Sequence, residues 1–229
     1  AAGWSIERGL YADVYGPAGE GALVRRLANH AATMAPILIQ RLGVRPGGTL
    51  DIYVLDDQAE FQRLQPGRIP DWADGTAWPK DRLIFLRAPN LRANTADPVE
   101  TVLTHELVHA LLGPAFGGRD VPTWLQEGLA QFYAGESNAR ALAMARGDYG
   151  GGSFSLSQLT DGFPINPAGA RLAYAQSADF IGFVAGHSGD AGLQTLVRHL
   201  AAGETTDAAL RAAIGMSLSD AVVAGRTPT

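Results

Sequence analysis

Residues 95–114 read TADPVETVLTHELVHALLGP, and this stretch decides how the rest of the chain is interpreted. At its centre, residues 105–109 read HELVH, so that two histidines flank a three-residue spacer. On an α-helix, residues i and i+4 lie on one face with their β-carbons about 5–6 Å apart. If this segment is helical, it therefore presents His105 and His109 together.

Signals at both ends of the stretch predict such a helix. Asp97 suits the N-cap, Pro98 suits the first helical position, and Glu100 lies where a capping-box acid reaches back to the Asp97 amide. The dipeptide Gly113-Pro114 predicts the end of the helix. One face is apolar at the 3.6-residue period and would anchor the helix in a core: Val99, Leu103, Leu107, Ala110 and Leu111.

The paired imidazoles have the donor chemistry of a zinc site. Neutral imidazole nitrogen binds Zn²⁺ at about 2.0–2.1 Å, so two histidines one turn apart can occupy two corners of a tetrahedron. Glu106 is rotated by about 100° from its neighbour on the helix, which places it beside the metal as a base for metal-bound water. The alternative is a structural pair of histidines on a buried helix. That pair would have to satisfy several buried polar atoms without a metal.

A third ligand is predicted downstream, where residues 120–130 read DVPTWLQEGLA. Thr123 and Gln126 form a T-x-x-Q pattern that predicts a capping box, and Glu127 falls in the first turn of that second helix, 18 positions after His109. The alternative role for this carboxylate is to complement the helix dipole. Gly128 costs about 1 kcal/mol in a helix interior, which predicts a close backbone approach there. Two histidines and one glutamate leave a coordination position open, as catalytic zinc sites do.

The combination of HELVH with the later PTWLQEGLA resembles the gluzincin metallopeptidases, most closely their small peptidase-MA-like bacterial members. The resemblance implies a zincin-like fold with one zinc ion held by His105, His109 and Glu127, and Glu106 as the catalytic base. The two motifs together are highly specific for zinc hydrolases and weakly specific for the substrate.

Aminopeptidases of the aminopeptidase N type carry a GxMEN motif upstream, whose glutamate holds the free amino group of the substrate. The matching stretch here, residues 75–79, reads GTAWP and lacks that glutamate, which favours an endopeptidase over an aminopeptidase. Pro79 predicts an edge strand, because proline cannot donate to an interior ladder. An extended substrate could pair with such an edge. The alternative is an ordinary edge strand without a substrate role.

The same relatives carry a tyrosine in a YxKG sequence that donates to the oxyanion. Tyr174 lies 65 positions after His109 in the sequence YAQS, so the likeness is partial. A phenol over the metal would stabilise the tetrahedral oxygen. The alternative is a core tyrosine with its hydroxyl at the surface. The other histidines, at positions 30, 187 and 199, lack ligand spacing and are predicted to be structural or solvated.

Composition excludes several other classes of protein. The 229 residues are 46% hydrophobic and 18% charged, which is typical of a globular protein. A net charge of −5 with scattered basic residues argues against nucleic-acid binding. The absence of cysteine excludes disulfides, cysteine-ligated zinc and thiol nucleophiles. No apolar stretch approaches the roughly 18 residues of a transmembrane helix.

The start of the sequence bears on where the protein acts. It begins with Ala-Ala-Gly and has no initial methionine. The same is true of a mature form after removal of a secretory signal and of a trimmed expression product. The resemblance to envelope-associated bacterial proteins favours an extracytoplasmic setting, whether secreted, periplasmic or in the cell envelope.

The order of strand and helix patterns predicts an α+β fold. Strands are expected at 10–15, 50–55, 75–79 and 82–87, with a long helix at 22–42 that Pro36 should kink or split. The helix that carries Glu127 is expected to run through Tyr133, and a short helix capped by Ser137 or Asn138 is expected to end at Arg146. Further helices are expected at 171–185, 191–201, 207–213 and 218–223. We expect one catalytic domain with a small mixed, largely antiparallel sheet packed on helices in a lobe of residues 1–113. A mostly helical lobe of residues 114–229 follows, with zinc in the cleft between the lobes.

The predicted function is that of a zinc-dependent metallopeptidase that hydrolyses bonds in peptide or protein substrates. Glu106 would take the proton of zinc-bound water and return it to the leaving amine, and Tyr174 would share the oxyanion. One alternative is a scaffold that keeps the zinc site without turnover, which the intact Glu106 argues against. The other is a zinc hydrolase of cell-wall peptides or of non-protein amides, which the sequence does not distinguish.

Overall fold

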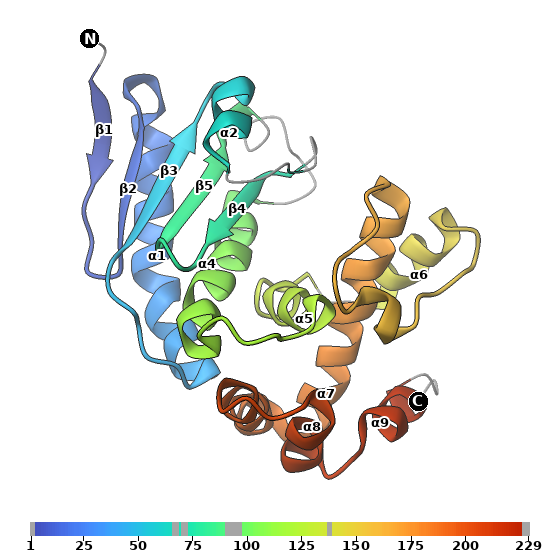
Figure 1. The fold of residues 1–229 in the computed structure, drawn as a ribbon. Coiled ribbons are helices and arrows are strands. Elements are labelled where there is room, and N and C mark those ends of the chain that lie inside the picture. Colours follow the sequence, from blue (N-terminus) through green and yellow to red (C-terminus); the bar gives the residue numbers. More distant parts are fainter. Residues whose placement is uncertain (1–2, 66–68, 70–72, 90–97, 137–138, 226–229) are drawn as a thin grey trace. The chain divides into compact units, whose positions relative to one another are not determined.

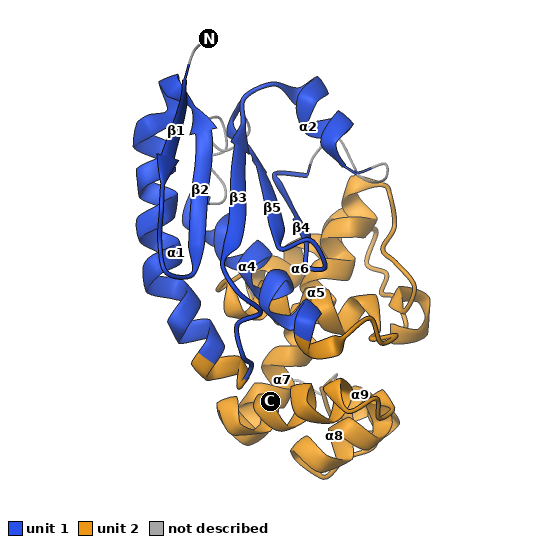
Figure 2. Cartoon of the chain, turned by 60° about the vertical axis from the view of Figure 1, so that its left-hand side comes forward, with its two compact units in different colours: residues 1–39, 44–114 blue, residues 40–43, 115–229 orange. Residues whose placement is uncertain are grey.

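The computed structural model describes residues 3–65, 69, 73–89, 98–136 and 139–225 (Figure 1). These form two compact units (Figure 2). Unit 1 comprises residues 1–39 and 44–114, and unit 2 comprises residues 40–43 and 115–229. Asp97, the predicted N-cap, lies outside the described residues.

A five-stranded sheet forms the centre of unit 1 (Figure 1). Its strands are β1 (Trp4–Glu7), β2 (Ala12–Pro17), β3 (Leu50–Leu55), β4 (Gly75–Trp78) and β5 (Leu83–Arg87), in the order β1-β2-β3-β5-β4. The two outer pairs are antiparallel, and the two central pairs, β2–β3 and β3–β5, are parallel. The sheet is mixed, as predicted, but its centre is parallel rather than antiparallel. Parallel neighbours require a long crossover, and helix α1 (Gly21–Leu42) supplies it between β2 and β3.

Helices cover both faces of this sheet. Helices α1 and α4 (Val99–Phe116) lie on one face, against the buried alternate residues of the strands, such as Val14, Ile52 and Ile84. Helix α2 (Gln58–Leu64) lies on the other face, where Phe61 packs with Leu55 and Phe85. The side chain of Asp57 accepts a hydrogen bond from the Glu60 amide at 2.7 Å and so caps the start of α2.

Both prolines within the helices of unit 1 are tolerated. Helix α1 continues through Pro36 as one helix, so the predicted split was wrong; the carbonyl deprived of its donor belongs to the exposed Ala32, where it can face water. Helix α4 passes Gly113 and Pro114 and ends at Phe116, so the predicted stop was wrong. Gly117, with φ of 58°, follows this end and provides the left-handed residue that terminates helices.

Unit 2 is mostly helical in its described residues. Its helices are α5 (Thr123–Tyr133), α6 (Ala139–Asp148), α7 (Pro167–Ala201), α8 (Thr206–Ile214) and α9 (Leu218–Gly225), with a 3₁₀ turn at Leu156–Leu159. Asn166 caps α7 by accepting a hydrogen bond from the Gly169 amide at 2.7 Å. The predicted interruption between residues 185 and 191 is confirmed at Gly189, whose φ of 59° kinks α7.

Among the described helices, no single one is long and apolar enough to cross a membrane. Only the bent pair α8 and α9, which meet at 63°, passes the same test of length and composition jointly.

Candidate metal centre

The HELVH residues lie on α4, and the helix presents the two histidines together as predicted. The Nε2 atoms of His105 and His109 are 3.1 Å apart, and both side chains are half-buried. Two corners of a tetrahedron with zinc–nitrogen bonds of 2.0–2.1 Å are about 3.3 Å apart, which is close to this separation. The anchoring residues of the same helix, Leu103, Leu107 and Leu111, are buried.

Polar contacts hold the first turns of α4 against α1. Both carboxylate oxygens of Glu100 accept hydrogen bonds from Arg26, with Nη2 to Oε2 at 2.9 Å. The hydroxyl of Thr104 donates to the Glu100 carbonyl at 2.8 Å and accepts from Nε2 of His30 at 2.7 Å. Glu100 therefore joins two helices, where the sequence had predicted a capping-box role, and His30 is structural as predicted.

The environment shifts the protonation of this group of side chains. The hydrogen bonds from Arg26 lower the pKa of Glu100 below its ordinary value. Burial lowers the pKa of His30, so that its neutral form is favoured.

Glu106, the predicted base, is buried on the side of α4 that faces the edge of the sheet. It is 8% exposed, and its side chain lies against Gly75 of strand β4. Glu106 thus lies next to β4, which the sequence predicted to be at the sheet edge.

Glu127 is the fifth residue of α5, just past a first turn that holds no acidic side chain, so the predicted first-turn position was wrong; the side chain is half-buried. The predicted capping box is wrong, because Pro122 occupies the N-cap and Gln126 donates its side-chain amide to the Val121 carbonyl at 2.7 Å. The close approach predicted at Gly128 is confirmed. A β-carbon there would lie 2.6 Å from the carbonyl oxygen of Ser177 on α7.

The three predicted ligands form a group that could hold a metal ion. His105, His109 and Glu127 each offer one ligand atom, and these atoms all lie within 4.8 Å of one another. Two imidazole nitrogens and one carboxylate oxygen are the protein donors of many catalytic zinc sites, which keep a further position open. The residues present therefore fit a zinc ion by number, by atom type and by separation.

Tyr174 lies on α7, half-buried, with its ring edge-on to Phe163 at a centroid distance of 4.9 Å. Gln176, which replaces the lysine of the related motif, accepts from the Phe154 amide at 2.9 Å and donates to the Phe154 carbonyl at 3.1 Å. The departure from the family pattern thus has a structural role in unit 2. The part of Tyr174 in catalysis stays a prediction.

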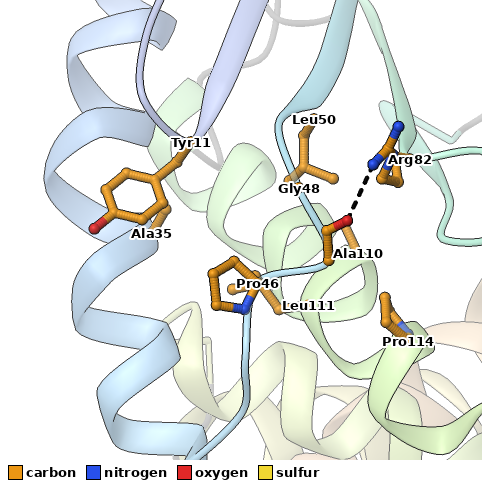
Figure 3. Close-up of a pocket in the computed structure, with 10 residues that line it drawn as sticks. Tyr11, Ala35, Pro46, Gly48, Leu50, Arg82, Ala110, Leu111 and Pro114 are labelled. Carbon is orange, nitrogen blue, oxygen red and sulfur yellow. Dashed lines mark hydrogen bonds between the residues drawn. The ribbon is translucent and has the colours of Figure 1, made fainter.

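A small hollow in unit 1 involves none of the predicted site residues (Figure 3). Arg82, whose φ is 56°, extends along its rim and donates to the Gly47 carbonyl at 3.0 Å. The hollow has a cavity volume of about 10 Å³, which is enough for one water molecule. Its lining is mainly apolar: Tyr11, Ala35, Pro46, Gly47, Gly48, Leu50, Arg82, Ala110, Leu111 and Pro114.

Comparisons with known proteins agree with a candidate zinc site built from two imidazoles and one carboxylate. Residues 31–223 match the family model of the Peptidase MA superfamily. Native leukotriene A4 hydrolase from Saccharomyces cerevisiae superposes with a TM-score of 0.50 at 16% identity, over 87% of this chain and 33% of that chain. The yeast leukotriene A4 hydrolase in complex with bestatin gives a TM-score of 0.52 at 16% identity, over 96% of this chain and 36% of that chain.

No curated protein sequence matches. The chain spans about a third of the length of the structures it resembles. At such identity, the likeness shows a shared α+β fold.

Proposed function

Because the chain belongs to the Peptidase MA superfamily, we propose that it is a zinc-dependent metallopeptidase, and an endopeptidase rather than an aminopeptidase. The observation that carries this proposal is the group formed by His105, His109 and Glu127, whose ligand atoms lie within 4.8 Å of one another. A scaffold without turnover would have no need of a buried carboxylate beside such a group, and Glu106 is both present and buried.

Each of these side chains has a distinct role in hydrolysis. His105, His109 and Glu127 hold one zinc ion through two ring nitrogens and a carboxylate oxygen. When bound, zinc polarises the scissile carbonyl and lowers the pKa of water. Glu106 accepts a proton from the attacking water on a carboxylate oxygen and then delivers it to the leaving amine nitrogen. The Tyr174 hydroxyl donates a hydrogen bond to the oxygen that becomes negative.

Among the described residues no strand pairs with the outer edge of β4, and this free edge supports an extended peptide as substrate. The Arg87 amide donates to the Asp74 carbonyl at 3.0 Å, and hydrogen-bonded pairs alternate along an antiparallel ladder. Thr76 therefore bonds to β5, while Gly75 and Ala77 direct their amides and carbonyls away from β5. An extended chain can add to such an edge through backbone hydrogen bonds, whichever side chains it carries.

The side chains of β4 favour cleavage within a chain. Residues 75–79 contain no carboxylate that could hold a free amino group. The polar side chains of Thr76 and Trp78 are both engaged by Gln65, whose Oε1 accepts from them at 2.9 and 2.7 Å. This strand therefore offers backbone groups to a substrate and no charge to its terminus.

The test is a comparison of matched peptides with free and blocked amino termini. We expect the zinc-loaded protein to cleave both at internal bonds, and a chelator to abolish cleavage until zinc is restored. Glu106→Gln should lower kcat by about 10²–10⁴-fold, because it removes the proton acceptor, while its zinc content stays at the wild-type level.

Other outcomes would contradict the proposal. Zinc-loaded wild-type protein that cleaves no peptide would indicate a binding scaffold. Cleavage confined to cell-wall fragments would indicate the other alternative, and removal of single amino-terminal residues only from unblocked peptides would indicate an aminopeptidase.

A further inference from the structure

The predicted base on helix α4 lies close to Gly75 of strand β4. A β-carbon built on Gly75 would lie 3.0 Å from Cγ and 3.1 Å from Oε1 of Glu106, and 3.0 Å from Cδ2 of Leu86. Ordinary van der Waals contacts begin at about 3.5 Å, so an alanine at this position requires its neighbours to move. The Glu106 carboxylate thus lies in the space that a side chain at position 75 would claim.

A second glycine contact shows that β4 follows α4 for two helical turns. A β-carbon on Gly113 of α4 would lie 2.1 Å from Cβ of Pro79, the residue that follows β4. From Glu106 to Gly113, α4 rises about 10 Å at 1.5 Å per residue. From Gly75 to Pro79, an extended chain covers about 13 Å. The two segments therefore run side by side, with a missing side chain at each end of their contact.

We propose that Gly75 is a positioning residue for the base, because the space left by its absent side chain determines where the Glu106 carboxylate lies. Gly75 also directs its backbone groups to the free edge of β4, so one residue both borders the substrate strand and locates the proton acceptor. This inference rests on the proposed function for its catalytic consequence. The steric coupling between Gly75 and Glu106 stands independently of it.

The coupling is tested first without catalysis or metal, by thermal unfolding of the chelated protein in a double-mutant cycle. Gly75→Ala should lower Tm in the wild-type background, because the added methyl group crowds the Glu106 carboxylate. In the Glu106→Ala background the same substitution should lower Tm less, since only the contact with the end of the Leu86 side chain remains and alanine is better suited than glycine to a strand. Equal shifts in the two backgrounds would overturn the inference.

The cycle gives an answer even where Gly75→Ala alone fails to fold. If the single variant is unfolded and the Gly75→Ala/Glu106→Ala double variant folds, the two positions are coupled as proposed. If both are unfolded while Glu106→Ala folds, the obstacle lies elsewhere, and the inference is wrong.

The catalytic consequence is tested on zinc-loaded protein. Gly75→Ala should lower kcat by about 10- to 100-fold through misplacement of the base, with wild-type zinc content and little change in KM. The acid limb of the pH profile of kcat should also move, because it reports the proton acceptor.

Gly16→Ala is the matched control. Gly16 lies on the same face of the sheet, where a β-carbon would be 2.6 Å from Cγ2 of Val24, far along the sheet from the base. Gly16→Ala should lower Tm and leave the pH profile unchanged. If the wild type is active and Gly75→Ala matches Gly16→Ala in kcat and pH profile, positioning of the base is disproved. If the wild type is inactive but the unfolding cycle shows coupling, the proposed function fails and the steric relation remains.

Discussion

Helix α4 in unit 1 and helix α5 in unit 2 each carry part of the predicted site, and each makes a close contact that involves a glycine. In unit 1 the glycine is Gly75 on the neighbouring strand, and it faces the side chain of Glu106. In unit 2 the glycine is Gly128, next to the functional residue, and it faces the backbone carbonyl of Ser177 on α7. The first contact governs the place of a carboxylate, whereas the second governs the place of a whole helix. Substitution at Gly75 should therefore affect the chemistry, and substitution at Gly128 should affect stability.

The largest effect expected in unit 2 is on the metal. Glu127→Ala removes one of the three proposed ligands and should weaken zinc affinity by more than about 100-fold, as measured by competition with a chelator. Gln131→Ala on the same helix is the control and should keep the wild-type affinity. If Glu127→Ala binds zinc stoichiometrically and with wild-type affinity, Glu127 is not a ligand and α5 does not contribute to the metal site.

Tyr174 is the one residue of unit 2 for which an effect on the chemistry is expected. Tyr174→Phe removes the proposed hydrogen-bond donor to the oxyanion and should lower kcat by about 100-fold, with zinc content unchanged. Tyr149→Phe removes another hydroxyl from unit 2 and should retain full activity. If kcat is the same in both variants, the role of Tyr174 is limited to its packing with Phe163.

Gly128→Ala should reveal the contact between helices as a loss of stability. An added methyl group must displace the Ser177 carbonyl or the α5 backbone, and we expect the free energy of unfolding to fall by about 1–3 kcal/mol. Gly186, in the interior of α7, has no neighbouring atom within 4 Å of its built β-carbon. Gly186→Ala should instead stabilise the protein by about 0.5–1 kcal/mol. Equal effects of the two substitutions would show that the α5–α7 contact is loose.

The smallest effect concerns the pH dependence of the Arg26–Glu100 pair in unit 1. The pKa of Glu100 is lower in the folded chain, so its carboxylate contributes stability above the unfolded pKa of about 4.3. This contribution is lost as the pH falls through the folded pKa. As the pH falls from about 5 to about 3, the Tm of the wild type should therefore decrease more steeply than the Tm of Glu100→Gln.

Glu60→Gln is the control for this comparison, because Glu60 lies 3.8 Å from Arg63 on the surface of α2. It should follow the wild-type curve. If the curves of Tm against pH are parallel for all three proteins, the charge of the Arg26–Glu100 pair does not contribute to stability.

The sequence predicted the parts of the site that depend on local spacing. The i, i+4 relation of HELVH and the backbone approach at Gly128 follow from helical geometry and from the absence of a side chain, so both were visible in advance. The contact between Gly75 and Glu106 joins residues that are distant in sequence, and only the register of β4 against α4 reveals it. A glycine at the start of an edge strand was the one available signal, and it is also typical of a turn.

Errors at the element ends have a similar origin. Gly113-Pro114 is a strong local stop signal, yet Gly113 serves the contact with Pro79 and the helix continues. Strand β1 was not predicted, because it has only four residues and no fully buried side chain. It is a strand because it pairs with β2, and its composition gives no such signal.

The crossover through α1 has a consequence for how the chain reaches its native state. Strands β2 and β3 are sequence-distant neighbours, so the centre of the sheet cannot assemble before a long intervening segment has been ordered. Assembly from distant pairings is slow, whereas helices that pack on near neighbours form early. During refolding, we therefore expect backbone amides of α8 and α9 to gain protection from hydrogen exchange before those of β3 and β5.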